Sequence, residues 1–267
     1  MPEGPEVRRI AKGLSERVSG RKLLKVEVLS GRYTKKEVPG MSDAVVSLPA
    51  EVKGVGVHGK FMYWIVNNDY FLWNTLGMTG CWTARPKKHS RVKFCLDDGD
   101  VYFTDVRNFG TLKFVKGRKS LIDKLKTLGP DMLAEDVSND VFRQRIEKKP
   151  DWEICKAIMN QAVVSGVGNY IKADALWLAG LSPTRKVKDM SVEEINTLNE
   201  CIKKVLRTSY ESGGATIRTY QNFDEKNGEY SSRFLVYSRD KDPEGNEVLR
   251  QKTSDGRMTH WAPDKQH

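Results

Sequence analysis

The two residues that follow the initial methionine could carry out covalent chemistry. If Met1 is removed, Pro2 begins the chain, and a chain-terminal amine has a pKa of about 8, so part of it is unprotonated at neutral pH. Such an amine can attack a carbonyl-like carbon and form an imine. Glu3 stands beside it, where a carboxylic acid could donate or shuttle a proton. The pair suits covalent chemistry on a sugar carbon, although proline and acids are also common in a first helical turn.

Three loops carry side chains that could contact a nucleic acid. Lys60 follows a glycine bend in VGVHGKFMYW and could contact a phosphate or a sugar. Met78 in LGMTG, and Arg107 and Phe109 in DVRNFG, stand at strand ends. There they could fill the gap that remains when a base leaves the duplex stack. A solvated turn lysine and ordinary edge packing are the structural alternatives.

The stretch QAVVSGVGNYIKADALWLAGLSP predicts one helix that ends at a Gly-Val-Gly turn and a second that Asn169 caps. Two glycines before a helix expose backbone N–H groups that favour a phosphate. A plain helix–turn–helix inside a bundle is the alternative. Arg257, in SDGRMTHW, would project from a hairpin turn, either as a contact residue or as a solvated cation.

The elements that would position these residues change in character along the chain. Apolar residues at helical spacing predict a helix from Pro5 to about Val18. Short β-rich runs separated by turn residues fill residues 22–115, and LDDGDVYF predicts a hairpin with Gly99 at positive φ. Helical periodicity follows over residues 138–149, 151–164, 169–179 and 191–211, and the final stretch returns to strand–turn–strand. The prediction is an α+β fold in three parts, with boundaries 1–130, 131–230 and 231–267.

The overall composition favours a polyanionic partner. Lys and Arg number 45 against 35 Asp and Glu, for a net charge of +10. No run of 18 apolar residues exists, so no membrane partner is expected. The terminus lacks a signal-peptide core, and the four cysteines include no C-x-x-C pair. These features predict an intracellular, reducing compartment and neither disulfides nor a metal cluster.

The order of the quoted segments resembles the formamidopyrimidine-DNA glycosylase and endonuclease VIII family over nearly the whole chain. The resemblance implies a β-sandwich, a helical domain with a helix–two-turn–helix, and a β-hairpin finger. It implies that Pro2 attacks the sugar C1′, that Glu3 donates a proton and that Lys60 contacts the lesion's phosphate. The same resemblance gives void-filling roles to Met78, Arg107 and Phe109 and DNA-binding roles to Asn169, Tyr170 and Arg257. It also places a base-covering loop at about residues 213–230.

Departures from the family pattern concern the finger and two single positions. The family's C-P-x-C-Q reads Ala262-Pro263-Asp264-Lys265-Gln266 here, so zinc cannot bind in the usual way. The finger and the PEGP opening point to the endonuclease VIII-like branch with a zincless finger, where strand pairing and Trp261 packing would replace the ~10 kcal/mol or more that zinc can contribute. Asn108 replaces a second arginine, and Asp174 replaces a common glutamate. No cofactor is expected.

The predicted function is a bifunctional DNA glycosylase and AP lyase of base-excision repair. It would act as a monomer on double-stranded DNA that contains oxidised bases or abasic sites, with single-stranded DNA left open. Oxidised pyrimidines such as thymine glycol are the expected substrates, with hydantoins left open, and β,δ-elimination would cleave the strand through a Schiff base at Pro2. The expected compartment is one with access to DNA, and the nucleus, the cytoplasm and a viral factory are left as alternatives. The alternatives are a non-catalytic damaged-DNA binder and an RNA-binding protein that uses the helix–two-turn–helix alone.

Overall fold

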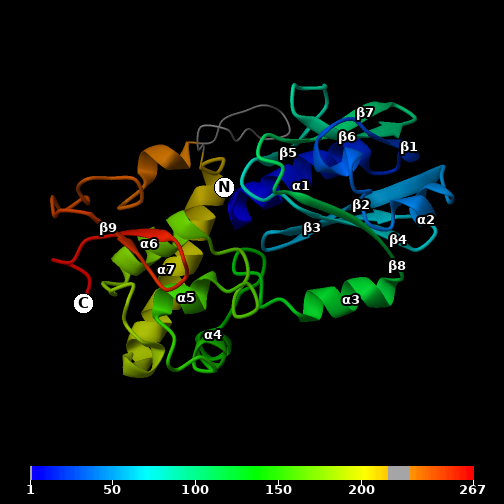
Figure 1. The fold of residues 1–267 in the computed structure, drawn as a ribbon. Coiled ribbons are helices and arrows are strands. Elements are labelled where there is room, and N and C mark those ends of the chain that lie inside the picture. Colours follow the sequence, from blue (N-terminus) through cyan, green and yellow to red (C-terminus); the bar gives the residue numbers. More distant parts are fainter. Residues whose placement is uncertain (1, 216–228) are drawn as a thin grey trace. The chain divides into compact units, whose positions relative to one another are not determined.

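The structure, a computed structural model, describes residues 2–215 and 229–267 (Figure 1). These residues form two compact units. The first contains Pro2, Glu6–Thr127 and residues 213–215, and the second contains Glu3–Pro5, Leu128–Ser212 and Glu229–His267. The three-part division with boundaries after residues 130 and 230 stays a prediction.

Most strands lie between residues 22 and 116, and most helices lie between residues 118 and 211. The helices are α1 (Gly4–Val18), α2 (Met41–Val45), α3 (Arg118–Lys126), α4 (Asn139–Ile146), α5 (Ile154–Met159), α6 (Asn169–Leu178) and α7 (Val192–Glu211), with 3-10 turns η1 (Gly31–Thr34), η2 (Val187–Asp189) and η3 (Tyr230–Arg233). The strands are β1 (Lys22–Val28), β2 (Ala50–His58), β3 (Phe61–Val66), β4 (Tyr70–Thr75), β5 (Gly80–Thr83), β6 (Ser90–Leu96), β7 (Gly99–Asp105), β8 (Thr111–Lys116), β9 (Leu249–Lys252) and β10 (Met258–Trp261).

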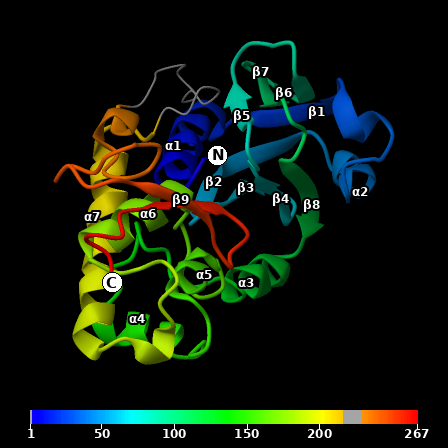
Figure 2. The same cartoon turned by 60° about the vertical axis from the view of Figure 1, so that its left-hand side comes forward.

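The first unit is built on an eight-stranded antiparallel sheet with the order β5-β7-β6-β1-β2-β3-β4-β8 (Figure 2). The pairing of β1 with β2 is short, so the sheet consists of two halves. The ring of Trp64 in β3 lies 5.0 Å from that of Trp82 in β5 and 5.2 Å from that of Phe94 in β6. These contacts bring the inner faces of the two halves together as a β-sandwich.

Periodicity in the sequence explains why these segments fold as they do. In β6 every second residue, from Ser90 to Leu96, is buried, as expected for a strand with one face in the core. In α1 the residues Val7, Ile10 and Leu14 are buried in the same core as the sheet. The predicted hairpin forms between β6 and β7, with Leu96 opposite Gly99 and Gly99 at φ 91°.

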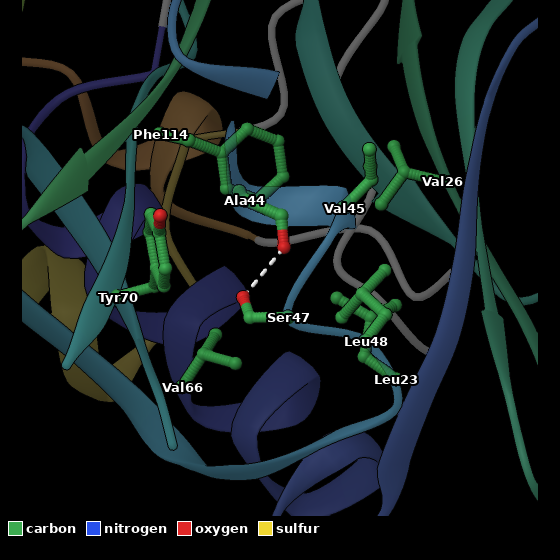
Figure 3. Close-up of a pocket in the computed structure, with 9 residues that line it drawn as sticks. All are labelled: Leu23, Val26, Ala44, Val45, Ser47, Leu48, Val66, Tyr70 and Phe114. Carbon is green, nitrogen blue, oxygen red and sulfur yellow. Dashed lines mark hydrogen bonds between the residues drawn. The ribbon is translucent and has the colours of Figure 1, made fainter. Parts of the chain in front are cut away.

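A small apolar cavity lies between α2 and the strands β1, β3, β4 and β8 (Figure 3). The nine side chains labelled in Figure 3 line it, and the hydroxyl of Ser47 donates to the carbonyl of Ala44 at 2.7 Å. None of the nine is charged, and the cavity measures about 10 Å³. This is room for about one water molecule, so the cavity is no candidate for a substrate site.

The second unit is built around α6, which packs against α5, α7 and β10. Every residue of α6 from Tyr170 to Trp177 is buried, and Trp177 and Ala173 share an apolar cluster with Val236 and Ala262 of the C-terminal segment. The long helix α7 begins with a capping box, in which Ser191 and Glu194 each accept the other's backbone N–H. The turn between α5 and α6 carries the Gly-Val-Gly motif.

The predicted fold class is confirmed, but helix lengths differ. Only Ile154–Met159 is α-helical within the predicted range 151–164, because the chain is already extended at Asn160. The short helices α2 and α3 were not predicted, since α3 is a lysine-rich segment in which Leu121 is the one buried residue. Among the described residues no helix is long and apolar enough to cross a membrane.

Candidate functional site

The Glu3 carboxylate lies at the N-terminus of α6. Its Oε1 accepts from the N–H of Tyr170 at 3.0 Å, and its Oε2 accepts from the N–H of Ile171 at 3.4 Å. Glu3 is 2% exposed. Helix N-terminal N–H groups lack partners within the helix, and the macrodipole favours negative charge there. The first turn of α6 therefore holds the candidate acid in one place.

Two glycines of the Gly-Val-Gly turn make this arrangement possible. The N–H of Gly4 donates to the carbonyl of Gly166 at 2.9 Å, and a Cβ on Gly4 would stand 3.0 Å from the Gly166 Cα and carbonyl oxygen. A Cβ on Gly168 would stand within 2.5 Å of both Glu3 carboxylate oxygens. Glycine is therefore required at Gly4 and at Gly168. This contact links the PEGP opening to the GVGN motif.

These contacts correct the expected phosphate cradle. The N-cap of α6 is Gly168, not Asn169, and it makes no side-chain cap. Backbone N–H groups at this helix start were expected to favour a phosphate, and those of Tyr170 and Ile171 donate to Glu3. The reason is that a carboxylate from the chain's own start reaches this helix end, and sequence spacing does not reveal a contact across 167 residues.

Asn169 binds the finger hairpin. Its Nδ2 donates to the backbone carbonyl of Met258 in β10 at 3.0 Å. An amide nitrogen carries two protons and can donate to a second acceptor, such as a phosphate. Asn169 therefore stands where the start of α6 meets the hairpin, and its role in DNA binding stays a prediction.

The side chain of Tyr170 is buried in the second unit. The residue is 0% exposed, and its hydroxyl lies 2.8 Å from the Ser209 hydroxyl in α7. Its ring lies 5.5 Å from Tyr230 and 5.4 Å from Phe234. This aromatic cluster places the Tyr170 side chain in the core of the second unit, and the DNA-binding role of Tyr170 stays a prediction.

Arg257 is exposed at the tip of the β9–β10 hairpin. The N–H of Thr253 donates to the carbonyl of Arg257 at 3.0 Å, and Gly256 takes the left-handed conformation at φ 74°. The tip therefore projects a long cation into solvent, as the sequence predicted. The role of Arg257 in DNA binding stays a prediction.

The two loops that carry the predicted void-filling residues lie against each other in the first unit. A Cβ on Gly77 would stand 2.8 Å from the backbone of Phe109, so the Met78 loop and the Arg107–Phe109 loop are in contact. The Arg107 guanidinium lies 4.9 Å from the centre of the Phe109 ring, and Phe109 is 53% exposed. An exposed aromatic that stacks with a cation suits insertion beside a base.

Asp105, at the end of β7, organises both loops and was missed by sequence reasoning. It is fully buried, and it accepts from the Thr79 hydroxyl and from the N–H of Gly110 at 2.7 Å. The Thr79 hydroxyl in turn accepts from the N–H of Arg107 at 2.9 Å. The sequence signal for Asp105 was its place as an aspartate that ends an apolar strand just before a loop. Asn108 adopts φ 58°, a left-handed conformation that asparagine tolerates well.

Pro2 and Lys60 belong to the first unit with these loops. Pro2 is buried, and Lys60 is half-buried in the turn between β2 and β3, where His58 pairs with Phe61 and Gly59 adopts φ 56°. The turn holds the lysine at the end of a paired hairpin. The base-covering loop predicted at residues 213–230 falls largely on residues 216–228, outside the described residues.

The finger does not fit a zinc ion. Ala262 and Lys265 stand where the family motif has thiolates, and the Lys265 ammonium contacts Glu244 and lies 4.0 Å from the Trp177 ring centre. Neither side chain has the chemistry of a zinc ligand. Trp261, which was expected to replace the metal by packing, is only half-buried.

Asp242 holds the base of the finger. Its carboxylate accepts from the N–H groups of Glu244 at 2.9 Å and Asn246 at 2.8 Å, and from the Trp177 indole N–H at 2.8 Å. Hydrogen bonds from Asn246 and Trp177 outweigh burial and lower the pKa of Asp242. On the other side, the Gln266 amide bonds the N–H of Ala262 at 2.7 Å and the carbonyl of Leu181 at 2.9 Å. The expected strand pairing is present between β9 and β10, and these polar side chains add further cross-links at the base of the finger.

Comparison with known proteins agrees with this architecture. Residues 1–112 match the formamidopyrimidine-DNA glycosylase N-terminal domain, and residues 128–221 match the formamidopyrimidine-DNA glycosylase H2TH domain. A formamidopyrimidine-DNA glycosylase of Prochlorococcus marinus is 31% identical over 98% of this chain and 99% of its own length.

Solved structures give the same result. A mutant Lactococcus lactis FPG in complex with Fapy-dG-containing DNA is 28% identical, covers 100% of both chains and superposes with a TM-score of 0.89. The wild-type Lactococcus lactis protein in complex with DNA that contains an oxidised pyrimidine is 26% identical over 100% of both chains, with a TM-score of 0.87.

Proposed function

Because the chain belongs to the formamidopyrimidine-DNA glycosylase family, we propose that it removes oxidised bases from DNA in base-excision repair and then cleaves the strand as an AP lyase. The observation that carries this proposal is the buried Glu3 carboxylate, held by two N–H groups of α6 directly after Pro2. An acid fixed next to a nucleophile is what covalent chemistry at a sugar carbon requires.

The proposed reaction begins at the Pro2 nitrogen, freed by removal of Met1. Its lone pair forms a bond to C1′, and the glycosidic bond breaks with its electron pair leaving on the base, which takes up a proton from water. The Pro2 nitrogen, now positively charged, loses its own proton to the Glu3 carboxylate. Glu3 then gives a proton to the ring oxygen O4′, the C1′–O4′ bond breaks and an iminium ion forms at C1′. Loss of a proton from C2′ expels the 3′ phosphate, and a second elimination expels the 5′ phosphate.

The remaining predicted residues bind and distort the DNA in this proposal. Lys60 contacts the phosphate of the damaged nucleotide, and Asn169 and Arg257 contact the backbone. Met78, with Arg107 and Phe109 in the adjoining loop, occupies the space that the flipped nucleotide leaves. The contact between these two loops supports a joint action. Phosphate contacts supply much of the affinity, so binding should weaken steeply with salt.

We propose oxidised pyrimidines such as thymine glycol as the main substrates, through membership of the endonuclease VIII-like branch with a zincless finger. The PEGP opening and the Ala262–Gln266 segment support this branch. Purine-derived lesions are a second candidate, because relatives have been solved with Fapy-dG and with 8-oxo-G as well as with an oxidised pyrimidine. A cleavage panel with thymine glycol, a hydantoin, Fapy-dG and 8-oxo-G would rank them. Fastest cleavage at Fapy-dG or 8-oxo-G would overturn the pyrimidine assignment.

Borohydride trapping tests the chemistry. The protein is incubated with a duplex that bears thymine glycol or an abasic site, and borohydride reduces the imine to a stable amine. We expect a covalent adduct that maps to Pro2 of a chain without Met1. Absence of an adduct, with binding intact, would favour a non-catalytic damaged-DNA binder. An adduct that Pro2→Gly leaves at another residue would overturn the nucleophile assignment.

A further inference from the structure

A buried lysine in α6 is unexplained by the roles described above. Lys172 follows Asn169 by one helical turn and is 0% exposed. Its ammonium donates to Asp255 Oδ2 at 2.6 Å and to the Thr259 hydroxyl at 2.7 Å. A lysine is almost never fully buried unless it is paired, and removal of one partner from a buried pair is strongly destabilising. The position therefore carries a specific contact to the finger hairpin.

Asp255 connects this contact to the residue at the tip. Its second oxygen, Oδ1, accepts from the Thr253 hydroxyl at 2.6 Å and from the backbone N–H of Arg257 at 3.1 Å. One carboxylate thus binds α6 with one oxygen and the backbone of Arg257 with the other. Burial opposes ionisation of both groups, so it lowers the pKa of Lys172. The hydrogen bonds from Lys172 and Thr253 more than offset burial at Asp255, and they lower the pKa of that carboxyl.

A second acid holds the same turn from α5. Glu153, at the N-cap of α5, accepts from the Ser254 hydroxyl at 2.5 Å and from the Ser254 N–H at 3.3 Å. The hairpin turn at residues 253–257 is therefore attached to two helices of the second unit by side chains on consecutive residues, Ser254 and Asp255. A turn joined to the rest of the protein by a two-stranded ribbon alone would lack these constraints.

We propose that the Lys172–Asp255 ion pair, assisted by Glu153, is a positioning device that fixes the finger tip so that the Arg257 guanidinium meets DNA in a preset geometry. This inference rests on the proposed function of Arg257 as a DNA contact. Rigid placement reduces the conformational entropy lost on binding, and displacement of a contact residue by about 1 Å can cost two orders of magnitude in activity. Lys172 and Asp255 are positioning residues, since they act through Arg257.

The test is a double-mutant cycle read by binding. Affinity for a duplex that bears a tetrahydrofuran abasic analogue is measured by fluorescence anisotropy at several salt concentrations. We expect Arg257→Ala to weaken binding about tenfold and to reduce the salt slope by about 1. We expect Asp255→Asn to weaken binding about three- to tenfold with a reduced slope. In the Arg257→Ala background, Asp255→Asn should change affinity by less than about twofold.

The matched control is Asp240→Asn in the same C-terminal segment. Asp240 pairs with Arg250 at 2.8 Å, but its side chain is 94% exposed, and exposed pairs contribute little. It should bind like wild type. If Asp255→Asn is not folded by circular dichroism, Ser254→Ala replaces it, since this change removes only the hydroxyl that donates to Glu153. Ser254→Ala should cause a smaller loss of affinity for the duplex, and this loss should also vanish in the Arg257→Ala background.

Each outcome decides the inference. Wild-type affinity in Asp255→Asn, or an undiminished loss in the Arg257→Ala background, would overturn it. Failure of the proposed function is seen separately, as a wild-type protein that yields no borohydride adduct or does not bind the lesion duplex.

Discussion

Gly168→Ala isolates the contact between the start of the chain and α6. Gly168 adopts φ −131° and ψ −163°, extended backbone that alanine accepts without strain. The new methyl group would stand within 2.5 Å of both carboxylate oxygens of Glu3. The carboxylate must therefore leave its position, and the N–H groups of Tyr170 and Ile171 lose their acceptor. The substitution acts through Glu3 although it leaves Glu3 unchanged.

The magnitude follows from the two hydrogen bonds that are lost. Hydrogen bonds to charged groups contribute about 1.5–3 kcal/mol each, so displacement of the carboxylate should cost about 3–6 kcal/mol. Replacement of glycine by alanine at an N-cap adds up to about 1 kcal/mol. In a Glu3→Ala protein the carboxylate is already absent, and only the N-cap cost should remain. We therefore expect a coupling energy of at least about 2 kcal/mol between the two positions.

Urea unfolding of the wild type, the two single variants and the double variant measures this coupling. Trapping with borohydride should show that Gly168→Ala loses adduct formation to the same extent as Glu3→Ala. An equal destabilisation by Gly168→Ala in both backgrounds would refute the placement of Glu3 at the helix end.

Three further predictions concern the second unit. Burial raises the pKa of Asp174 from its ordinary 3.8 to about 6, so stability present below pH 3.8 is lost as the pH rises through 6. Urea unfolding from pH 4 to 8 should show that the free energy of unfolding falls by about 3 kcal/mol. In Asp174→Asn this dependence on pH should be much weaker. Arg257→Ala should lower the cleavage rate on a lesion duplex and leave the melting temperature unchanged, because its side chain is exposed; unchanged cleavage would count against its role. Metal analysis should find no stoichiometric zinc, because Ala262 and Lys265 cannot coordinate a zinc ion. For the same reason, EDTA should leave the melting temperature unchanged. One equivalent of bound zinc would contradict the zincless finger.

Local patterns in the sequence predicted the elements well. The spacing of Val7, Ile10 and Leu14 identified α1, and turn residues identified the β6–β7 hairpin. The loops that carry Met78, Arg107 and Phe109 were predicted as a set, and the structure places those loops in contact. These features depend on neighbours within a few residues, where side-chain periodicity and turn chemistry are informative.

Contacts between distant residues could not be predicted. Tyr170 follows Asn169 and was grouped with it, but its environment is set by Ser209, Tyr230 and Phe234, which lie far along the chain. The partner of Lys172 lies 83 residues away. The sequence does not distinguish a buried lysine from a solvated one, because only the packing around the side chain shows that water is excluded.

The carboxylate and amide groups that hold the finger have a consequence for its durability under oxidants. A thiolate oxidises readily, whereas the carboxylate of Asp242 and the amide of Gln266 offer no sulfur to peroxide. The nearest thiol to the tip, Cys155, is buried, and burial raises its pKa to about 11, so almost none of it is thiolate. Oxidants that damage bases therefore find no thiolate at these two positions, and the exposed sulfur of the hairpin is the thioether of Met258.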